Sequence, residues 1–257
     1  MIQRTLLFVG GNGHSASRLI AARDSLAALE GAPPFTLEDA ALPGFEGRPR
    51  PASLDALLDA VAGPMAACAE SGGLVYATGI GALLALAARA RLPPPLPPLL
   101  LQGPVLWGLR ARWMPRLMRL SAVRAMALRL FASTRFQRRF WRTKTDLPWE
   151  HPLRAPFFEG YARCPAFADL FHWITPFWLR RLEDALRARA GALAGVRVWW
   201  GGRDPVVGIA ELHVTEQALG VSWPLRVFPA WAHYPMLDDP GGWVRALAAE
   251  MDEADPA

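Results

Sequence analysis

The amino-acid sequence predicts an α/β fold in which a mostly parallel, doubly wound sheet carries an inserted helical cap. Short apolar segments alternate with helical segments near both ends of the chain, and glycine-rich turns follow two of the apolar segments. Strands that alternate with helices are typical of a parallel sheet covered on both faces. The alternation stops between residues 105 and 193, where the pattern is helical. We therefore predict a core formed by residues 1–104 and 194–257, and a helical cap or lid formed by residues 105–193.

Four strands are expected in the first part of the core. Each is a short apolar run bounded by glycine, proline or charged residues, which is the pattern of a buried strand. The segments between these runs favour helices, two of which begin near a serine that can cap them. The expected strands are Thr5–Val9, Pro34–Asp39, Leu74–Ala77 and Pro98–Gln102, and the expected helices are Ser15 or Ser17 to Leu29, Ser53–Ala69 and Ile80–Arg91.

The alternation of strands and helices resumes after residue 193. Val196–Trp200 and Leu225–Phe228 are short apolar runs with the pattern of strands. A helix ending near Leu219 separates them, and a closing helix is expected at Trp243–Met251. These elements extend the same sheet, so we predict that both ends of the chain belong to one core.

Composition restricts the class of protein. The 257 residues are 52% hydrophobic and 20% charged, which is sufficient for one large folded domain. The two cysteines, Cys68 and Cys164, imply no disulfide framework and lack partners at metal-ligand spacing. The first apolar run is too short for a signal peptide, and no run reaches the ~20 residues of a membrane span. We expect a soluble, cytoplasmic protein without metal or cofactor.

Three segments with candidate site residues follow predicted strands, at the edge where open α/β sheets place their ligands. The first is Gly10–Gly13 and the second is Ala77–Gly81. The third combines Asp204, after the strand VRVWW, with His233 in the sequence AWAHYPMLDDP. A carboxylate beside a histidine orients the imidazole and stabilises its protonated form during proton transfer. The pair therefore predicts a general base at this edge.

The order of these segments resembles the α/β-hydrolase superfamily over nearly the whole chain. LLFVGGNGHS resembles the family's first strand and oxyanion loop, and ALPGFEGRP resembles the segment after the next strand, with Ala41 in place of the usual acid. GGRDPVV and AHYPMLDDP resemble the acid loop and the histidine loop. The resemblance implies the α/β-hydrolase fold and a catalytic triad in the order nucleophile, Asp204, His233.

The chain departs from the family at the nucleophile. The family pattern G-x-S-x-G corresponds here to Ala77-Thr78-Gly79-Ile80-Gly81, so Gly79 occupies the nucleophile position. A shift by one residue would make Thr78 the nucleophile, but it would place Ile80 where a close-packed glycine belongs. Glycine has no oxygen or sulfur for a histidine to deprotonate, so covalent acyl transfer has no nucleophile here.

The resemblance also implies an oxyanion hole and a substrate-binding surface. The expected donors are the backbone N–H groups of Gly11 and Ile80, the second lying at a helix N-terminus. The aromatic residues between positions 157 and 178 are expected to line an apolar pocket. The residues expected to contact substrate are Asn12, Thr78, Phe158, Phe171 and Trp178.

Several candidate residues also have simpler interpretations. Asp204 can shape the turn before a helix, and His233 can be a hydrogen-bonded structural histidine. Asn12 can serve to form a left-handed turn instead of binding substrate. His14, in the same loop, is more typical of a capping or surface residue than of a catalytic one.

Positive charge is concentrated in one part of the predicted cap. Residues 110–144 contain eleven arginine and lysine residues and no acid, although the net charge of the chain is only +5. Trp113, Leu117, Leu120, Met126, Leu130 and Phe131 recur there at roughly helical spacing. This pattern fits an acidic carrier protein, an anionic membrane surface or an anionic substrate, or else a cap whose apolar side covers the pocket. No nucleic-acid-binding module is recognisable, and none is expected.

Three functions are compatible with this sequence. The first is hydrolysis of an apolar ester or acyl thioester, the serine having been replaced by Gly79 naturally or by engineering. The second is non-covalent catalysis with His233 and Asp204 as the general base of a lyase, cyclase or hydrolase. The third is a catalytically inactive module that binds a lipophilic ligand or a partner.

Overall fold

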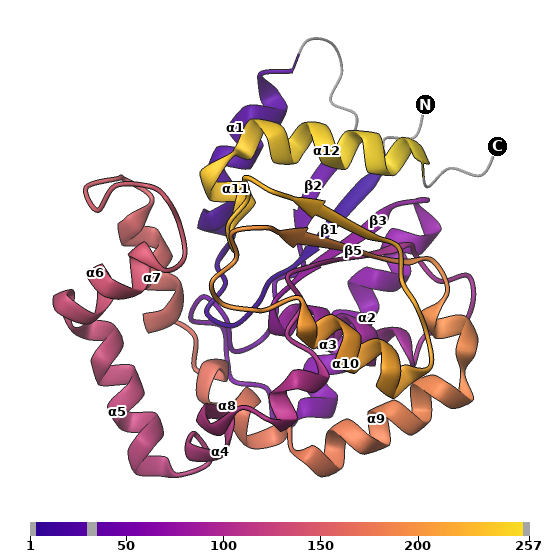
Figure 1. The fold of residues 1–257 in the computed structure, drawn as a ribbon, viewed down its shortest axis with the longest axis horizontal. Helices are drawn as coiled ribbons and strands as arrows, with labels where there is room; N and C mark the ends of the chain where they lie inside the picture. Colours follow the sequence, from indigo (N-terminus) through magenta and orange to yellow (C-terminus); the bar gives the residue numbers. More distant parts are fainter. Residues whose placement is uncertain (1–3, 30–34, 254–257) are drawn as a thin grey trace.

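The computed structural model describes residues 4–29 and 35–253, and its core is a six-stranded sheet (Figure 1). Every neighbouring pair of strands is parallel, in the order β2-β1-β3-β4-β5-β6. The predicted parallel sheet is therefore confirmed. The strands are β1 (Thr5–Val9), β2 (Thr36–Asp39), β3 (Leu74–Thr78), β4 (Leu99–Gln102), β5 (Val196–Gly201) and β6 (Leu225–Phe228); Pro34, expected in the second strand, lies outside the described residues.

The register of the central strands aligns the segments that carry the candidate site. Val9 of β1 pairs with Ala77 of β3, and Thr78 of β3 pairs with Gln102 of β4. The loops after β1, β3 and β4 therefore leave the sheet at the same edge. The order of strands also changes direction between β1 and β3, and open α/β sheets bind ligands at such a switch point.

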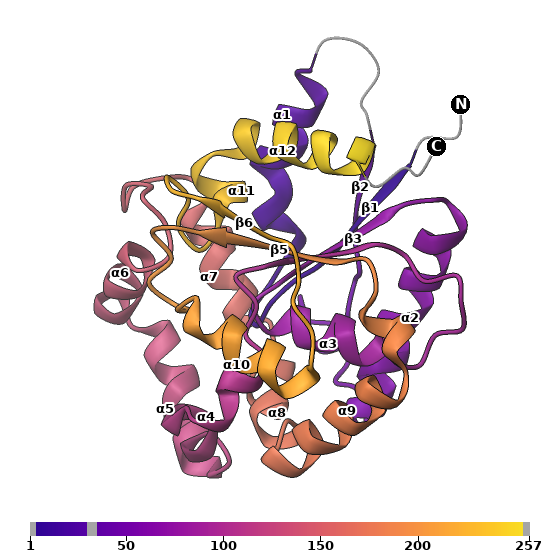
Figure 2. The same cartoon turned by 45° about the vertical axis from the view of Figure 1, so that its right-hand side comes forward.

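Helices cover both faces of the sheet (Figure 2). On one face α1 packs against α12, and on the other face α2 packs against α3, with α10 alongside (Figures 1 and 2). All residues of α3 are buried, because it lies between the sheet and the outer helices. The bounds of these helices are α1 (Ile20–Ala27), α2 (Leu54–Glu70), α3 (Ile80–Arg89), α10 (Ala210–Leu219), α11 (Pro235–Asp238) and α12 (Pro240–Glu253).

The first expected helix differs most from its prediction. A short 3-10 helix, η1 (Ala16–Leu19), precedes α1, and neither begins with a side-chain capping hydrogen bond. Ser15 instead bonds to the neighbouring Ser17 hydroxyl at 2.5 Å. By contrast, Ser53 caps α2 as expected, because its hydroxyl accepts a hydrogen bond from the Ala56 N–H at 3.1 Å.

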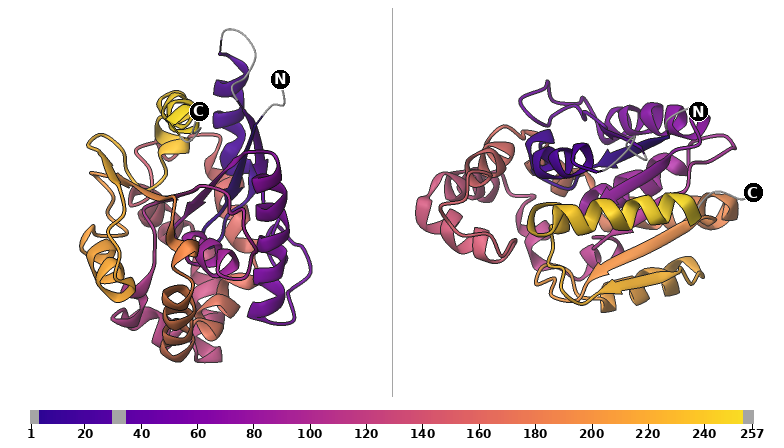
Figure 3. Two further views of the ribbon diagram at one scale, coloured as in Figure 1. Left: turned by 90° about the vertical axis from the view of Figure 1, so that its right-hand side faces the viewer. Right: turned by 90° about the horizontal axis from the view of Figure 1, so that it is seen from above.

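The segment between β4 and β5 is helical throughout its regular elements, and α5–α7 stand beside the sheet (Figure 3). An aromatic cluster fills their interior; the Phe131 and Tyr161 rings, for example, stack with centroids 4.5 Å apart. The last helix of the segment, α9, packs against α10 of the core. The elements are η2 (Trp107–Arg110), α4 (Trp113–Leu117), α5 (Ser121–Ala132), α6 (Thr134–Arg142), α7 (Arg154–Ala162), α8 (Ala166–Trp173), α9 (Pro176–Ala188) and η3 (Ala190–Leu193).

Several large apolar side chains of α4, of α5 and of the turn between them face solvent. Trp113 is 70% exposed, and four other large apolar side chains of this region also face solvent, namely Leu117, Leu120, Met126 and Leu130. A different stripe of α5, formed by Val123, Ala127 and Phe131, packs inward. Within the described part of the chain, no helix combines the length and the apolar character that crossing a bilayer requires.

Candidate active site

Gly79 forms the sharp turn that links β3 to α3. Its backbone has φ 53° and ψ −125°, a conformation that costs a residue with a side chain on the order of 1–3 kcal/mol. The turn is held at both ends, since the Gly79 N–H donates to the Gln102 carbonyl at 3.3 Å and its carbonyl accepts from the Val105 N–H at 2.9 Å. A Cβ at this position would have only the Cα of Gly11, at 3.9 Å, within contact range. The turn therefore has the shape of a nucleophile elbow with room for a side chain.

Gly81 supports the alignment in which residue 79 is the nucleophile position. A Cβ on Gly81 would lie 2.5 Å from the carbonyl oxygen of Val9, so no larger residue fits without movement of β1. The Thr78 hydroxyl is buried and accepts a hydrogen bond from the Gly11 N–H at 3.2 Å. Thr78 thus lies against the loop after β1 and not at the apex of the turn.

Asp204 and His233 come together from the loops that follow β5 and β6. The His233 Nδ1 atom lies 2.8 Å from Asp204 Oδ2. The other carboxylate oxygen, Oδ1, accepts hydrogen bonds from the N–H groups of Val206 at 2.7 Å and Val207 at 3.2 Å. Both side chains are buried, and three protein nitrogen atoms hold the carboxylate in place. This arrangement leaves Nε2 as the imidazole nitrogen that can exchange a proton with a substrate.

The sequence matches no protein-family model. It also matches no curated protein. Solved structures with the same architecture include a haloalkane dehalogenase loop variant from Bradyrhizobium elkanii, at TM-score 0.71 and 18% identity over 98% of this chain and 90% of that one. They also include a bacterial membrane phospholipase A, at TM-score 0.69 and 20% identity over 99% and 80% of the two chains. A third is a meta-cleavage product hydrolase from Pseudomonas fluorescens, at TM-score 0.63 and 17% identity over 98% and 92%.

The chain has the α/β-hydrolase fold. These likenesses, together with the parallel sheet, confirm the fold that the resemblance implied. Within this fold, Gly79, Asp204 and His233 occupy loops at the same edge of the sheet, after β3, β5 and β6.

The electrostatics around His233 keep its imidazole neutral. Burial lowers the pKa of His233 below its ordinary value of 6.5, and the hydrogen bond that His233 donates to Asp204 offsets this effect only in part. The positive charges of Lys144 and Arg18 lower the pKa of His233 further. Burial raises the pKa of Asp204, but the hydrogen bonds from His233, Val206 and Val207 outweigh it and hold that pKa below 3.8. At neutral pH the pair is therefore an aspartate and a neutral histidine, the form required of a general base.

Arg18 is a site residue that sequence reasoning missed. It is only 3% exposed, and its guanidinium donates to the Gly13 carbonyl at 2.6 Å and to the Tyr234 hydroxyl at 3.5 Å. The guanidinium carbon also lies 4.3 Å from the centre of the Phe157 ring. Its position in the apolar sequence SRLIAA was the available signal, because a buried arginine requires a local reason.

Lys144 is the second residue that was missed. It is half-buried in the turn after α6, where burial lowers the pKa of its amine to about 8 although Asp204 acts to raise it. Lys144 is the only lysine of the chain, and all other basic side chains apart from histidine are arginines. A single lysine among so many arginines was the feature of the sequence that could have drawn attention to Lys144.

Among the buried polar atoms without a hydrogen-bond partner, several belong to residues that follow β1 or end β4, and others lie elsewhere in the structure. The Oδ1 atom of Asn12, Nε of Arg18 and both side-chain polar atoms of Gln102 are buried without a hydrogen-bond partner among the described residues. Unpaired buried polar groups are uncommon and often mark a place where a ligand binds. Asn12 lies in the loop after β1, and Gln102, at the end of β4, is the strand partner of Thr78. The role of Asn12 in binding substrate stays a prediction. The Gly11 N–H, expected in the oxyanion hole, is bonded to Thr78 in this state, whereas the Ile80 N–H begins α3 without an intrahelical acceptor.

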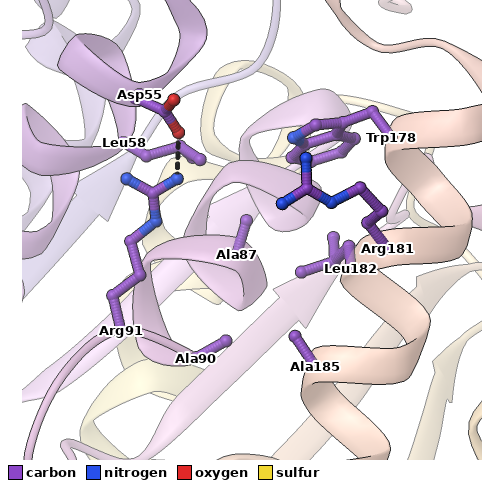
Figure 4. Close-up of a pocket in the computed structure, with 9 residues that line it drawn as sticks. All are labelled: Asp55, Leu58, Ala87, Ala90, Arg91, Trp178, Arg181, Leu182 and Ala185. Atoms are coloured by element: carbon purple, nitrogen blue, oxygen red, sulfur yellow. Dashed lines mark hydrogen bonds and ion pairs between the residues drawn. The ribbon is translucent and has the colours of Figure 1, made fainter.

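The structure places Trp178 away from this site, so its assignment as a substrate contact is corrected. Trp178 lines a surface pocket together with the C-terminal end of α3, whereas Gly79 precedes the N-terminal end of that helix (Figure 4). Arg91 pairs with Asp55 on the side of the pocket opposite Trp178 (Figure 4). The reason is that Trp178 of α9 points towards α2 and the end of α3, whereas the neighbouring Phe177 faces solvent. The pocket is lined by Asp55, Leu58, Ala87, Ala90, Arg91, Trp178, Arg181, Leu182 and Ala185.

Phe158 and Phe171 are buried in the aromatic cluster of the helical segment between β4 and β5. The Phe158 ring packs against Phe157, with centroids 5.2 Å apart, and Phe171 packs against Phe167 at 5.7 Å. Phe157 in turn contacts the Tyr234 ring at 5.6 Å, next to His233. Of these rings, Phe157 therefore contacts the residue beside His233, and Phe158 contacts Phe157.

His14 is neither a capping residue nor a surface residue. It is buried and its Nε2 lies 3.1 Å from Asp39 Oδ1, in a second histidine–aspartate pair beside β1. Within residues 4–29 and 35–253, no group of three or more histidine, cysteine, aspartate or glutamate side chains is arranged to hold a metal ion.

Proposed function

We propose that this chain is an α/β-hydrolase scaffold for apolar esters or acyl thioesters, with Gly79 in place of the nucleophilic serine. The observation that carries the proposal is the strained turn at Gly79, which stays open in the direction of a Cβ and faces the loop of Gly11. This glycine-specific turn lies at the same edge of the sheet as the buried Asp204–His233 pair, and a stable core alone requires neither of them. If residue 79 were a serine, His233 would accept the proton of its hydroxyl, and Asp204 would hold the imidazole in place.

An apolar acyl group fits the surroundings of the site. Phe157, Tyr161 and Tyr234 form a continuous set of ring contacts between the cap and His233, with Phe157 5.6 Å from both tyrosine rings. Buried aromatic surface of this kind favours ligands with hydrophobic groups. The Ile80 N–H at the start of α3 would stabilise the oxyanion that forms on the acyl carbonyl.

Turnover by Gly79→Ser tests the proposal. Hydrolysis of p-nitrophenyl butyrate and of an acyl thioester should rise by at least about 10²-fold over the parent chain, since oxyanion stabilisation and a nucleophile each contribute on that order. Gly79→Ala is the matched control, because it adds the same Cβ and backbone strain without a hydroxyl. If the serine and alanine variants fold equally well and hydrolyse at the same rate, the proposal is wrong.

A second candidate function uses the chain with Gly79 unchanged. A neutral His233 oriented by Asp204 can accept a proton from a water molecule or from a carbon acid, without an acyl-enzyme. The observation that favours it is the pKa of His233, which burial holds below 6.5 in the absence of any nucleophile. This function predicts turnover by the parent chain that is lost in His233→Ala, and no labelling by a fluorophosphonate.

The third possibility is an inactive module that binds a lipophilic ligand. It predicts ligand affinity that is indifferent to His233→Ala, because binding would depend on the apolar surface of the cap and not on proton transfer.

A further inference from the structure

Two positive charges lie beside the Asp204–His233 pair and form no ion pair with a described carboxylate. They belong to Arg18, from η1, and Lys144, from the turn after α6. We propose that Arg18 and Lys144 form an anion subsite next to His233, and that the ligand of this site is an apolar molecule with one carboxylate. This inference shares one assumption with the proposed function, namely that a ligand binds beside His233.

The turn that carries Lys144 is fixed to the core. The Thr145 hydroxyl bonds to Asp238 Oδ1, and the Asp146 N–H donates to the same oxygen at 3.0 Å. The Lys144 N–H donates to the Trp141 carbonyl at 2.9 Å. Asp238 ends the short helix that follows His233, so these bonds tie the lysine to the histidine loop. These bonds fix the backbone of the turn to the core, and the Lys144 Nζ lies 4.8 Å from the centre of the Phe140 ring of α6.

Arg18 reaches the same loop from the opposite side. Its guanidinium bonds to the Tyr234 hydroxyl and lies 5.1 Å from the centre of that ring, while the His233 and Tyr234 rings are 4.6 Å apart. The Nε–H of Arg18 has no partner among the described residues. Arg18 is only 3% exposed and is bonded only to neutral groups. These bonds do not fully compensate the free energy that is lost when its charge is removed from water.

Asp204 does not neutralise these two cations. Its oxygens are occupied by His233 and by the N–H groups of Val206 and Val207. The charged side chains that act on the imidazole are these two cations and Asp204, so a bound carboxylate would meet an excess of positive charge. Charge-assisted hydrogen bonds to such a carboxylate contribute about 1.5–3 kcal/mol each.

Binding of two ligands of equal size and different charge tests the subsite. Phenylacetate and phenylacetamide have the same number of heavy atoms, and calorimetry on the full chain with Gly79 unchanged measures both affinities. We expect phenylacetate to bind at least about tenfold more tightly, which corresponds to 1.4 kcal/mol. Equal affinities, or no measurable binding of phenylacetate, would overturn the proposal.

Variants assign the preference to the two residues. Lys144→Gln should remove most of the preference for phenylacetate, and Lys144→Arg should keep it, because the charge is retained. Arg142→Gln is the matched control, since Arg142 is exposed in the same cap and forms no ion pair with a described residue. Arg18→Lys preserves the charge if Arg18→Gln fails to fold, and it should weaken phenylacetate by less than tenfold. A preference that survives Lys144→Gln and Arg18→Gln in folded protein contradicts the proposal.

The single lysine permits a direct readout that does not depend on turnover. Reductive methylation with ¹³C-formaldehyde labels only Lys144 and the chain terminus, and NMR then gives the pKa of the labelled amine. We expect a pKa near 8 without ligand and a higher value with phenylacetate bound, because a bound carboxylate stabilises the ammonium. An unchanged titration would contradict contact between the two. Failure of Gly79→Ser to hydrolyse neutral esters would leave this result intact, so the two proposals are tested separately.

A second surface carries an independent inference. Trp113, Leu117, Leu120, Met126 and Leu130, here called the cap ridge, are exposed on α4 and α5 and in the turn between them, at the side of the molecule away from the sheet (Figures 1 and 3). Met126 and Leu130 are four residues apart on α5 and therefore adjacent on its surface. Next in the chain, α6 turns Arg135, Arg138, Arg139 and Arg142 to solvent.

We infer that the cap ridge docks on an anionic lipid bilayer. Of the exposed arginines on α6, only Arg138 has a described carboxylate nearby, at 3.9 Å from Glu150, so the positive charge of this face is unbalanced. Exposed tryptophan and leucine insert at the level of the lipid headgroups, and arginines beside them pair with anionic headgroups, at about 1 kcal/mol each. An acidic protein would pair with the arginines, but it would also have to bury the separate apolar side chains of the cap ridge.

Sedimentation with vesicles tests this surface. We expect the chain to bind vesicles of phosphatidylcholine and phosphatidylglycerol in equal parts, and to bind pure phosphatidylcholine vesicles at least about tenfold more weakly. The pair Leu120→Ser with Arg135→Glu should abolish binding, whereas Phe177→Ser with Arg180→Glu should not. The second pair makes the same changes on α9, where Phe177 is 63% exposed. Equal effects of both pairs, or no vesicle binding, would overturn the inference and leave an acidic protein as the occupant.

Discussion

A Cβ on Gly103 would lie 2.9 Å from Oδ2 of Asp204, the oxygen that bonds to His233. Gly103 follows β4 with φ +46°, so the end of a third strand shapes the space in which the carboxylate is held. The pair of Asp204 and His233 therefore depends on a backbone position that is distant from both in the sequence.

Replacement of Gly103 by alanine should destabilise the fold and disturb the pair. The positive φ costs about 1–2 kcal/mol for any residue with a Cβ, and the contact with Asp204 adds on the order of 1–3 kcal/mol. Gly220→Ala is the matched control, because Gly220 has φ +69° and no atom within 4 Å of a Cβ. Chemical unfolding of both variants measures the difference. Equal losses of unfolding free energy would mean that Gly103 matters only through its φ angle.

The pKa of His233 should respond in opposite directions to its two kinds of neighbour. Lys144→Gln removes a positive charge that lowers this pKa, so the pKa should rise. Asp204→Asn removes the carboxylate that raises it, so the pKa should fall further below 6.5. NMR titration of the imidazole nitrogens measures both, and His233→Gln assigns the signal among the five histidines. A shift of the same sign in both variants would contradict the arrangement of charges described for the site.

The lowered pKa of His233 also predicts how stability depends on pH. The unfolded chain takes up a proton at this histidine near pH 6.5, before the folded chain does. The free energy of unfolding should therefore decrease as the pH falls from 6.5 to the pKa of the folded state, and the decrease should be smaller in His233→Gln. Denaturant titrations over this pH range, with the two chains compared at each pH, provide the measurement. Parallel pH dependence in both would show that His233 is not shifted.

The strands and the elbow were predictable because their signals are local. Thr5–Val9 and Leu225–Phe228 have the same bounds in sequence and structure, since a short apolar run between turn residues has few alternative conformations. Gly81 could be recognised as a close-packed glycine from the pattern around Gly79. Asp204 and His233 could be named as a pair because each lies in a motif of known order. The bond between them, however, is visible only in three dimensions.

Other features could not be derived because they depend on contacts between distant segments. Arg18 and Lys144 are 126 positions apart in the sequence. Their charges both act on His233 only once the chain is folded. In the sequence, Lys144 belongs to a basic run that fits a solvated surface equally well. Trp178 lies in an aromatic-rich stretch, but the density of aromatic residues does not reveal which side of α9 faces the site. Likewise, amphipathic spacing in α5 does not determine whether Met126 or Phe131 turns inward.

Covalent labelling of Gly79→Ser by a fluorophosphonate tests most directly whether residue 79 faces the imidazole. We predict that the reagent adds once, that the mass increase maps to the peptide containing residue 79, and that the addition requires His233. The parent chain and the combination of Gly79→Ser with His233→Ala should remain unlabelled under the same conditions. A folded Gly79→Ser chain that stays unmodified, or that is labelled equally well without His233, would contradict the proposed active site.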